Sequence, residues 1–478
     1  MVMPTVEPYR NRRAEVSESL RCVAGGGTPG PSRIAGTLVS QEMSMPWTVD
    51  SREPEHETTI FMAMGHREVG KARKAGAHAR TPADRATVES SFRPRHNSLN
   101  FLRLVLAFAV VFSHAITIGS FGSETILNKT TLGTVAVYGF FGLSGYLIAG
   151  SASRNHVGRF LWQRFLRIFP AFWVCLIATA FLFGVIVWYR ANPVLAHRCG
   201  ISCYVKEPGG PLGYVFHNLW LRVPQSTIAH TLPLGYFRPV WNGSFWTLFF
   251  EFLCYLMLAF LAWIGLLRHR LAVAALAGAV WLTEITITSV PTLNQSFSPS
   301  HHWYVMKMLT FVPIFLGGSL LYLYREKIPD SGLLALGCSL AFLFGLVLPV
   351  GNSVPTFTFT SMDLTSVFLV YPLLWLGIHL PFHMVGARND YSYGVYIYAY
   401  PVQQLLVIWG ASRWGYWPYA LLSVVAVVPF ATASWWAIEK HALRLKSLNW
   451  FVPMMLGRRV PEDPSIKSLR IHRSNEGD

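Results

Sequence analysis

The chain has 478 residues, of which 52% are hydrophobic and only 13% charged, with a mean hydropathy of +0.36 and a formal net charge of +16. A soluble protein carries about twice that share of charged residues, so the composition excludes an ordinary soluble protein and favours a polytopic membrane protein. Basic loops at one membrane face explain the positive charge better than nucleic-acid binding, because no basic stripe lies on a soluble domain.

Residues 1–97 are polar and rich in Arg, Glu, Gly, Pro and Ser, and they contain no sustained apolar run and no signal-peptide core. This composition is typical of a disordered extension. The alternative is a later translation start, for which the candidates are Met43, Met45, Met62 and Met64. We expect residues 98–448 to form the membrane domain and residues 449–478 to form a basic cytoplasmic tail.

From Phe101 onward, ten apolar segments are long enough to span a membrane. They predict an all-α polytopic membrane protein with about ten transmembrane helices around a central cavity. The predicted segments are 101–119, 133–150, 168–190, 246–264, 271–289, 306–324, 333–350, 364–382, 390–410 and 418–438.

The charges of the short loops predict the orientation of these segments. Loops 151–167, 265–270, 325–330 and 383–389 together carry nine Lys and Arg residues, whereas the alternate loops 120–132, 290–305, 351–363 and 411–417 carry two. Basic loops remain in the cytoplasm. We therefore expect a multi-pass protein of the inner (plasma) membrane with both termini cytoplasmic.

The long loop from about 191 to 245 is expected on the outer side, and it contains Cys199 and Cys203. In an oxidising space a disulfide between them is favoured over two free thiols or a metal site with His197. The chain contains no pair of cysteines with zinc-site spacing, so no metal site is expected.

The first apolar segment contains two ionisable residues, Arg103 and His114. Their separation of eleven residues puts both on one helical face, ~16 Å apart along the axis. Ionisable residues within a span usually face the bundle interior or a water-filled cavity, so we interpret this face as the wall of a passage. Taken alone, the two residues also fit an arginine that reaches the headgroups and a histidine that bonds a neighbouring helix.

A carboxylate, Glu251, lies in the fourth apolar segment, five residues after its predicted outer end at Trp246. His114 is also five residues from the outer end of its own segment, so the two side chains are predicted at equal depth. A carboxylate that orients an imidazole makes it a general base. Tyr255 follows Glu251 by four residues and shares its helical face.

Two further stretches carry candidate functional residues. In RFLWQRFLRIFPAFW, Arg164 and Arg167 share a helical face, and two guanidinium groups among aromatic rings suit phosphate binding. Plain membrane topology explains the same arginines equally well. In YGFFGLSGYLIAG, the recurring glycines favour close helix packing, and Ser144 is a candidate for the lining of the cavity.

These stretches, in this order, resemble the membrane acyltransferase-3 family, whose members O-acylate cell-surface glycans and related acceptors. The resemblance covers about residues 97–445. It rests on the Arg103-to-His114 spacing, FFGLSG at 140–145, the RxxR of Arg164 and Arg167, NGSFWTLFFEFLCY at 242–255 and YSYGVYIYAYPVQQ at 391–404. One departure is Ala399, which stands where many members have a second histidine.

The resemblance implies that His114 is catalytic and that Arg103, Arg164 and Arg167 hold a cytoplasmic acyl-CoA, with acetyl-CoA expected and no tightly bound cofactor. The implied acceptor is an exopolysaccharide, O-antigen or lipid-linked sugar on the outer side. We expect direct transfer, in which His114 takes the acceptor proton, Glu251 orients the imidazole, and Ser144, Tyr255 or a backbone N–H stabilises the oxyanion. An acyl-enzyme on Ser144 is a variant of this mechanism.

Two other functions stay open at this stage. Ten spans with buried Arg, His and Glu also suit a proton-coupled transporter, although the two halves of the chain contain no obvious repeat. An acyltransferase that modifies a secreted small molecule would carry the same motifs.

Overall fold

The structure is a computed structural model that describes residues 86–127, 129–232, 239–290, 293, 299–348 and 360–447. The chain divides into residues 1–79 and 80–478, and every described residue belongs to the second unit. Most of the predicted disordered extension, up to residue 85, and the predicted tail at 449–478 lie outside the described residues.

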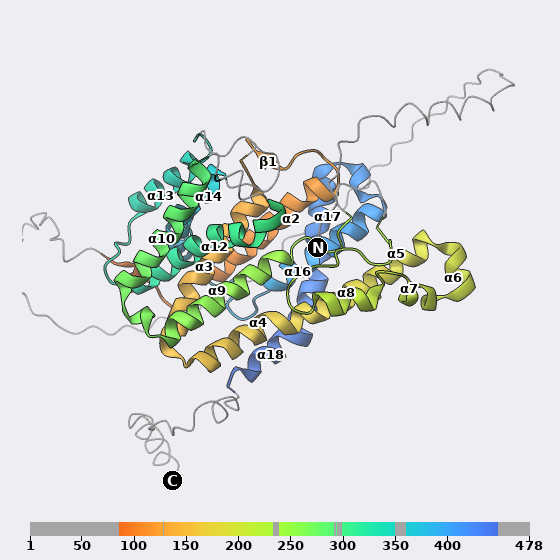
Figure 1. The fold of residues 1–478 in the computed structure, drawn as a ribbon, viewed down its shortest axis with the longest axis horizontal. Helices are drawn as coiled ribbons and strands as arrows, with labels where there is room; N and C mark the ends of the chain where they lie inside the picture. Colours follow the sequence, from red (N-terminus) through yellow and green to blue (C-terminus); the bar gives the residue numbers. More distant parts are fainter. Residues whose placement is uncertain are drawn as a thin grey trace, which may run out of the picture. The chain divides into compact units, whose positions relative to one another are not determined.

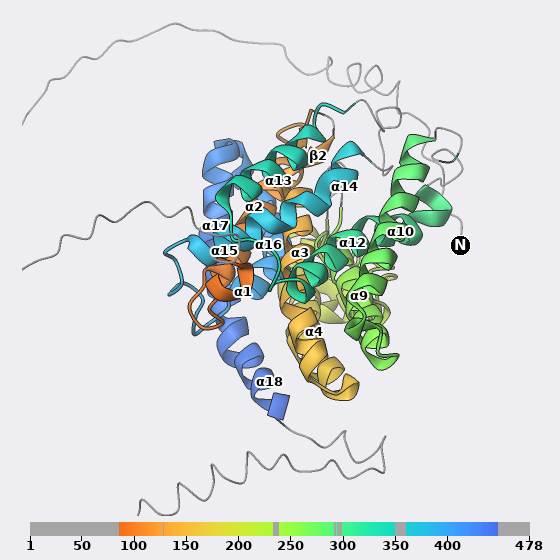
Figure 2. The same ribbon diagram turned by 90° about the vertical axis from the view of Figure 1, so that its left-hand side faces the viewer.

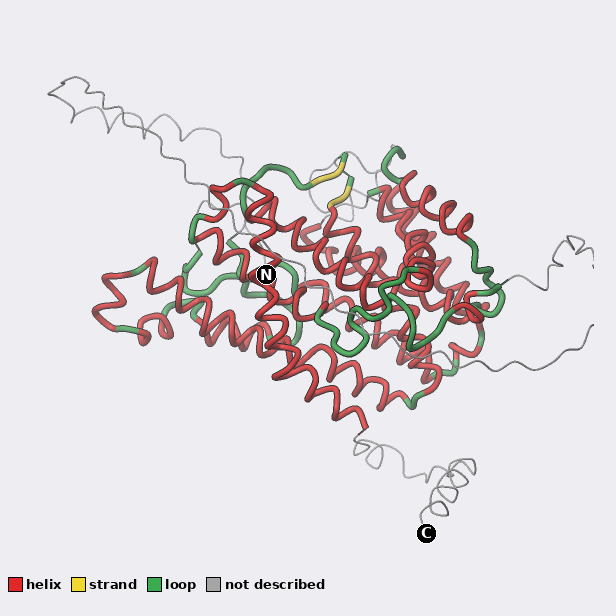
Figure 3. Tube along the Cα trace, turned by 180° about the vertical axis from the view of Figure 1, so that it is seen from behind, coloured by secondary structure: helices red, strands yellow, loops and turns green. Residues whose placement is uncertain are grey.

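Helices dominate the described part of the chain, which confirms the predicted all-α class (Figures 1 and 3). Its only paired strands are β1 (Thr125–Ile126) and β2 (Thr130–Thr131), an antiparallel pair in the loop between the first two long helices. Among the residues that the structure describes, eight helices are long and apolar enough to cross a membrane. They are α2 (Leu99–Ile118), α3 (Leu132–Arg154), α4 to α5 (Val157–Ala191), α9 (Trp246–Trp263), α10 (Arg270–Ser289), α12 (Pro299–Leu323), α14 to α15 (Ser361–His379) and α17 to α18 (Tyr416–Arg444).

Two of the ten predicted spans fall on shorter helices. Residues 333–350 correspond to α13 (Gly332–Phe344, 13 residues), and residues 390–410 correspond to α16 (Ser392–Ile408, 17 residues). Fifteen of the 17 residues of α16 are buried. Because α16 is enclosed by other helices, including α2, α4 and α17, its tyrosines and glutamines face protein rather than lipid.

Residues 151–167 do not form the predicted loop, because α3 continues to Arg154 and α4 already begins at Val157. The buried side chains of Phe160 and Leu166 give this stretch an apolar face, which the arginines hide in the sequence. The helix passes through Pro170, includes a π-helical turn, η2 (Thr179–Phe183), and ends as α5 (Gly184–Ala191).

After α5, the chain forms the short helices α6 (Pro193–Cys199), α7 (Ile201–Lys206) and α8 (Pro211–Asn218). A disulfide joins Cys199 to Cys203 across the turn at Gly200, as the sequence predicts. Gly200 has φ = 54°, a backbone conformation that a residue with a side chain rarely adopts.

Close contact between α3 and α12 confirms the packing role that the glycines predict. A Cβ atom on Gly145 would lie 2.0 Å from the carbonyl oxygen of Phe315, and one on Gly318 would lie 2.1 Å from that of Gly142. The two backbones therefore touch, and only glycine fits at these positions.

The segment just before α9 runs inside the bundle. Trp241, Asn242 and Ser244 are each at most 2% exposed. The Asn242 side-chain amide donates to the carbonyl of Ile397 in α16, 2.7 Å away, and Gly243 lies against the ring of Tyr400. Helix α9 therefore starts in the interior and not at the edge of the bundle.

Ordered contacts also begin earlier in the chain than residue 98. Helix α1 (Val88–Ser91) buries Val88 and forms backbone hydrogen bonds with the segment before α13, including Val88 N to Ile328 O at 3.0 Å. The polar sequence of residues 86–97 does not predict these contacts, because most of them are hydrogen bonds between backbone groups.

Candidate active site

Two of the three predicted phosphate-binding arginines converge on one carboxylate that the sequence analysis missed. Arg103 of α2 and Arg167 of α4 donate to Asp390 Oδ2 over 2.8 and 2.6 Å. The second oxygen, Oδ1, accepts from the backbone N–H and the hydroxyl of Ser392, the first residue of α16. Burial raises the pKa of Asp390, but the two guanidinium groups outweigh it and hold that pKa below its usual range.

Arg167 has a second acidic partner. Its Nη1 atom lies 3.5 Å from Glu439 Oε2, and the Glu439 side chain is only 2% exposed. Glu439 ends the π-helical turn η6 (Trp435–Glu439), which joins α17 (Tyr416–Ser434) to α18 (Lys440–Arg444), and it also accepts from the Ser434 hydroxyl. The position of Asp390, directly before the YSYG stretch in an acid-poor chain, was the sequence signal for this cluster.

Arg164, the third predicted arginine, differs from the other two. None of the hydrogen bonds or ion pairs in the described part of the chain involves its guanidinium group, and its Nε atom is buried. It lies near the ring of Phe160 and within electrostatic range of Tyr255 and Glu251.

Glu251 lies at the centre of a second polar group. Its Oε1 atom accepts from the Ser144 hydroxyl of α3 at 3.1 Å and from the hydroxyl of Tyr255, one helical turn away on α9. The structure thus brings together three of the four predicted catalytic residues. The fourth, His114, is not among the described partners of Glu251.

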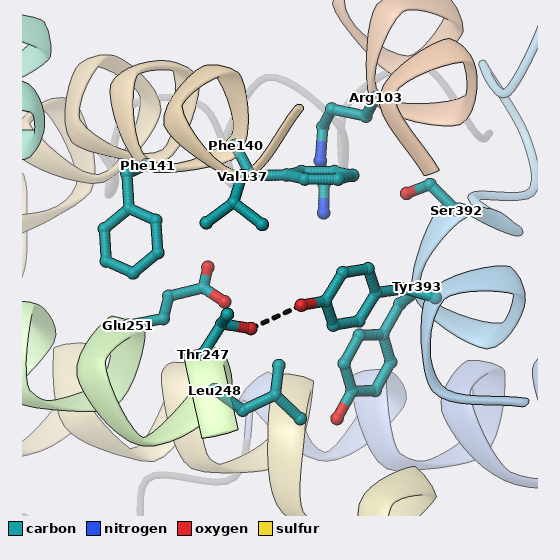
Figure 4. A pocket seen from close by; sticks show the side chains of 10 residues that line it. Arg103, Val137, Phe140, Phe141, Thr247, Leu248, Glu251, Ser392 and Tyr393 are labelled. Atoms are coloured by element: carbon teal, nitrogen blue, oxygen red, sulfur yellow. Dashed lines mark hydrogen bonds between the residues drawn. The ribbon is translucent and has the colours of Figure 1, made fainter. Parts of the chain in front are cut away.

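Arg103 and Glu251 point into one pocket from different helices (Figure 4). The empty space of this pocket is about 410 Å³, part of it open to solvent. The other lining residues are Val137, Phe140, Phe141, Thr247, Leu248, Ser392, Tyr393 and Tyr396. A hydrogen bond between the hydroxyls of Thr247 and Tyr396 closes one side (Figure 4).

The predicted pairing of Glu251 with His114 is wrong. Ser113, next to His114, lies beside Gly133 of α3, since a Cβ atom on Gly133 would lie 2.9 Å from its hydroxyl oxygen. Ser144, the partner of Glu251, is eleven residues further along α3, which is ~16 Å along the axis. Glu251 therefore lies near the depth of Arg103. The prediction failed because α9 starts inside the bundle.

Helix α16 connects the depths of Arg103 and His114. Ser392, Tyr396 and Tyr400 are spaced by four residues and so share one face, about 6 Å apart along the axis. Ser392 donates to Asp390, the carboxylate that Arg103 and Arg167 share, and Tyr396 lines the pocket. The ring of Tyr400 meets that of His114 edge to face at 5.0 Å. The face of α16 thus follows the predicted passage along α2.

The described residues include no group of three or more His, Cys, Asp or Glu side chains arranged to hold a metal ion. The site contains the guanidinium groups of Arg103 and Arg167 at one depth and the imidazole of His114 at the other. Polar and aromatic side chains line the space between them.

Comparison with known proteins decides the family. The sequence profile of a family described as an acyltransferase domain matches residues 96–436, which is most of the chain. The chain belongs to this acyltransferase family. It is therefore an acyltransferase of the membrane acyltransferase-3 type, as the motifs predict, and this assignment argues against the transporter alternative.

Three curated relatives support the family assignment. The chain is 30% identical to an O-acetyl transferase of Shigella phage Sf6, over 74% of this chain and 98% of the relative. It is 27% identical to Nodulation protein 10 of Rhizobium leguminosarum bv. viciae, over 73% and 94%. It is 31% identical to Acyltransferase MdmB of Streptomyces mycarofaciens, over 42% and 48%. No solved structure matches this acyltransferase.

For the chemistry of an acyltransferase, the geometry separates the predicted residues into two sets. His114 is the candidate base, and its ring contacts that of Tyr400. Ser144 and Tyr255 both donate to Glu251 near the depth of the arginines, too far from His114 to stabilise an oxyanion there. The catalytic role of each residue stays a prediction.

Proposed function

We propose that this acyltransferase moves an acetyl group from acetyl-CoA, bound through Arg103, Arg164 and Arg167, to a hydroxyl group of a glycan that meets His114. The acceptor is an exopolysaccharide, an O-antigen or a lipid-linked sugar. One observation carries the proposal: Arg103 and His114 both lie toward α16, at opposite ends of a face lined by Ser392, Tyr396 and Tyr400. Their separation of ~16 Å is comparable to the length of a pantetheine arm.

Two features support an orientation with the arginines at the cytoplasmic face of the inner membrane and both termini inside. The connecting segments on that side of the predicted topology carry nine of the eleven basic residues, four of them on the adjoining ends of α3 and α4. The disulfide between Cys199 and Cys203 lies in the long loop on the opposite side, where an oxidising space would preserve it. Acetyl-CoA would then enter from the cytoplasm, and the acceptor would approach from outside.

In the proposed reaction, His114 takes the proton of the acceptor hydroxyl while the oxygen attacks the thioester carbonyl. The carbon–sulfur bond breaks, the acyl group stays on the acceptor oxygen, and the thiolate leaves and is protonated to the free thiol. Direct transfer is favoured over an acyl-enzyme on Ser144. An acyl group at Ser144 would lie ~16 Å from an acceptor held at His114.

The name of the Shigella phage relative, O-acetyl transferase, supports both acetyl as the transferred group and a hydroxyl as the acceptor. A small secreted acceptor would use the same geometry. Mass spectrometry of surface polysaccharide from cells with and without the gene separates the two, because only a glycan acceptor would lose mass equal to one acetyl group per modified sugar.

The test of the mechanism uses full-length protein in membrane vesicles supplied with radiolabelled acetyl-CoA. We expect His114→Ala to reduce label transfer to surface glycan by at least about a hundredfold, the usual contribution of a general base. His96→Ala is the matched control, because the His96 ring stacks on that of His383 away from the passage. Full transfer by His114→Ala would refute the mechanism.

A further inference from the structure

The ring of Tyr400 in α16 contacts both the candidate base and the segment that precedes α9. Its centroid lies 5.0 Å from that of His114, with an angle of 72° between the two ring planes. On the segment before α9, a Cβ atom on Gly243 would lie 2.7 Å from Cζ of the Tyr400 ring. Tyr400 is only 5% exposed, so its ring has little space in which to move.

A proline in α16 explains why the segment before α9 approaches this closely. Pro401 has no backbone N–H, so the carbonyl of Ile397, four residues earlier, loses its helical donor. The Asn242 amide donates to this carbonyl at 2.7 Å, and the Cys175 thiol of α4 donates to it at 3.3 Å. The carbonyl that the proline leaves free therefore binds the residue directly before Gly243.

Two further hydrogen bonds to α16 hold this segment in place. The Tyr396 hydroxyl donates to the Ser244 carbonyl at 3.0 Å, and the Gln404 side-chain amide donates to the Val240 carbonyl at 2.9 Å. The two donors lie about one helical turn before and after Tyr400. The backbone between the two carbonyls is therefore a fixed surface against which the ring packs.

The helix that carries His114 is also joined to α16. The Gln403 side-chain amide donates to the Val111 carbonyl of α2 at 2.8 Å, and Gln403 is fully buried. Val111 lies about one turn from His114, and Gln403 lies about one turn from Tyr400. Figure 2 shows α2 and α16 side by side in the bundle. The packing of two joined helices therefore sets the distance between the imidazole and the Tyr400 ring.

This arrangement restricts the orientation of the imidazole. A general base acts only within hydrogen-bond reach of the proton that it accepts, ~2.6–3.2 Å. The His114 side chain can otherwise choose among staggered rotamers. A buried ring beside it excludes the rotamers that would occupy the same space, and the edge-to-face contact itself is favourable. Tyr400 therefore has the geometry for the orienting role that the sequence analysis assigned to Glu251.

We propose that Tyr400 is a positioning residue, which holds the His114 imidazole in the orientation that meets the acceptor hydroxyl. Gly243 is part of the same arrangement, because a side chain at this position would displace the Tyr400 ring. The inference rests on the proposed function, in which His114 is the base. It concerns the chemical step and not donor binding, since Tyr400 lies at the depth of His114, ~16 Å from Arg103 along the axis.

The test measures kcat and the KM for acetyl-CoA with full-length protein in membrane vesicles that contain the acceptor glycan. We expect Tyr400→Leu to lower kcat about tenfold, because an imidazole without the ring contact spends less time in the reactive orientation. The KM for acetyl-CoA should change by less than about twofold. Gly243→Ala should give the same pattern, since its methyl group displaces the ring. Tyr400→Phe, which keeps the ring, should retain kcat.

The matched control is Tyr398→Leu, which removes another buried ring from α16. Tyr398 is 4% exposed, and its ring stacks on that of Phe430, on a different face of the helix from Tyr400. Its loss should lower the melting temperature without changing kcat. Melting temperature and elution volume in detergent identify variants that do not fold. Gly243→Ala, on a separate segment, keeps the test decisive if Tyr400→Leu is one of them.

The outcomes separate this inference from the proposed function. If His114→Ala transfers acetyl groups as well as the wild type, the proposed function is wrong. If His114→Ala is inactive but folded Tyr400→Leu or folded Gly243→Ala keeps full kcat, the base is correct and the positioning role is wrong. A loss of kcat in Tyr400→Phe or in Tyr398→Leu equal to that in Tyr400→Leu would also overturn the inference.

Discussion

Arg167 and Asp390 form the shortest ion pair described in this protein, with 2.6 Å between Nη2 and Oδ2. Arg103 shares the same oxygen atom at 2.8 Å, so a single carboxylate joins α2 and α4 to the start of α16. Two of these helices, α2 and α16, contribute residues to the lining of the pocket.

We expect Asp390→Asn to destabilise the protein by about 3–5 kcal/mol, because it leaves two largely buried guanidinium groups without their common anion. The depressed pKa of Asp390 means that its stabilisation is complete above the unfolded pKa of about 4 and is lost only as the pH falls through the lower folded value. Thermal unfolding in detergent at neutral pH measures the effect.

Glu326→Gln is the control for Asp390→Asn. Glu326 is 45% exposed and pairs with Arg270 at 3.5 Å, and a surface pair of this kind contributes at most about 1 kcal/mol. Equal melting temperatures for the two variants would contradict a structural role for Asp390.

Glu251→Gln tests whether this carboxylate acts on His114. The pH dependence of kcat/KM in the free enzyme reports the pKa of the essential base. Since Glu251 lies ~16 Å from His114 in depth, we expect the variant to lower activity but to leave the acidic limb of the pH profile in place. A shift of that limb by more than about one pH unit would show that the two groups interact after all.

Gly145→Ala tests the contact between α3 and α12. The added methyl group would lie 2.0 Å from the Phe315 carbonyl, so the helices must separate, and we expect a loss of about 1–3 kcal/mol or failure to fold. Gly278→Ala is the matched control, because nothing lies within 4 Å of its Cβ position. Helix propensity predicts that the control gains about 1 kcal/mol, as measured by melting temperature.

Thiol labelling tests the proposed orientation. With a membrane-impermeant maleimide on intact spheroplasts, we expect labelling only after reduction, and none in a variant in which Cys199 and Cys203 are both serine. Cys175 and Cys254 are buried and should not contribute. Labelling that occurs only after the membrane is permeabilised would place the long loop in the cytoplasm and reverse the proposed topology.

The sequence predicts the helical class, most of the spans, the disulfide and the glycine contacts, because each of these depends on local pattern or short spacing. It also nominates seven site residues, of which five belong to the two polar groups near the depth of Arg103, and a sixth, Arg164, lies within electrostatic range of Glu251. It does not predict Asp390 or Glu439, because their arginine partners lie 223 or more residues away in the chain.

The prediction of the depth of Glu251 failed for a related reason. Hydropathy marks where an apolar helix begins, and it treats that point as the membrane boundary. Here Trp241 and Asn242 continue into the interior before α9 begins, and their polar groups are satisfied by Thr231 and by the carbonyl of Ile397. A bond between residues 155 positions apart leaves no local signal in the sequence.

The buried segment before α9 also constrains the order of assembly. The Asn242 amide donates to the Ile397 carbonyl, and Gly243 packs on Tyr400. Because both partners belong to α16, this segment cannot form its native contacts until α16 has been synthesised and inserted. During translation, the polar segment before α9 must therefore stay unpacked while α9, α10, α12 and α15 are synthesised. The proposed passage should therefore be one of the last parts to form, and chains that stop before α16 should be recognised and degraded as unfinished.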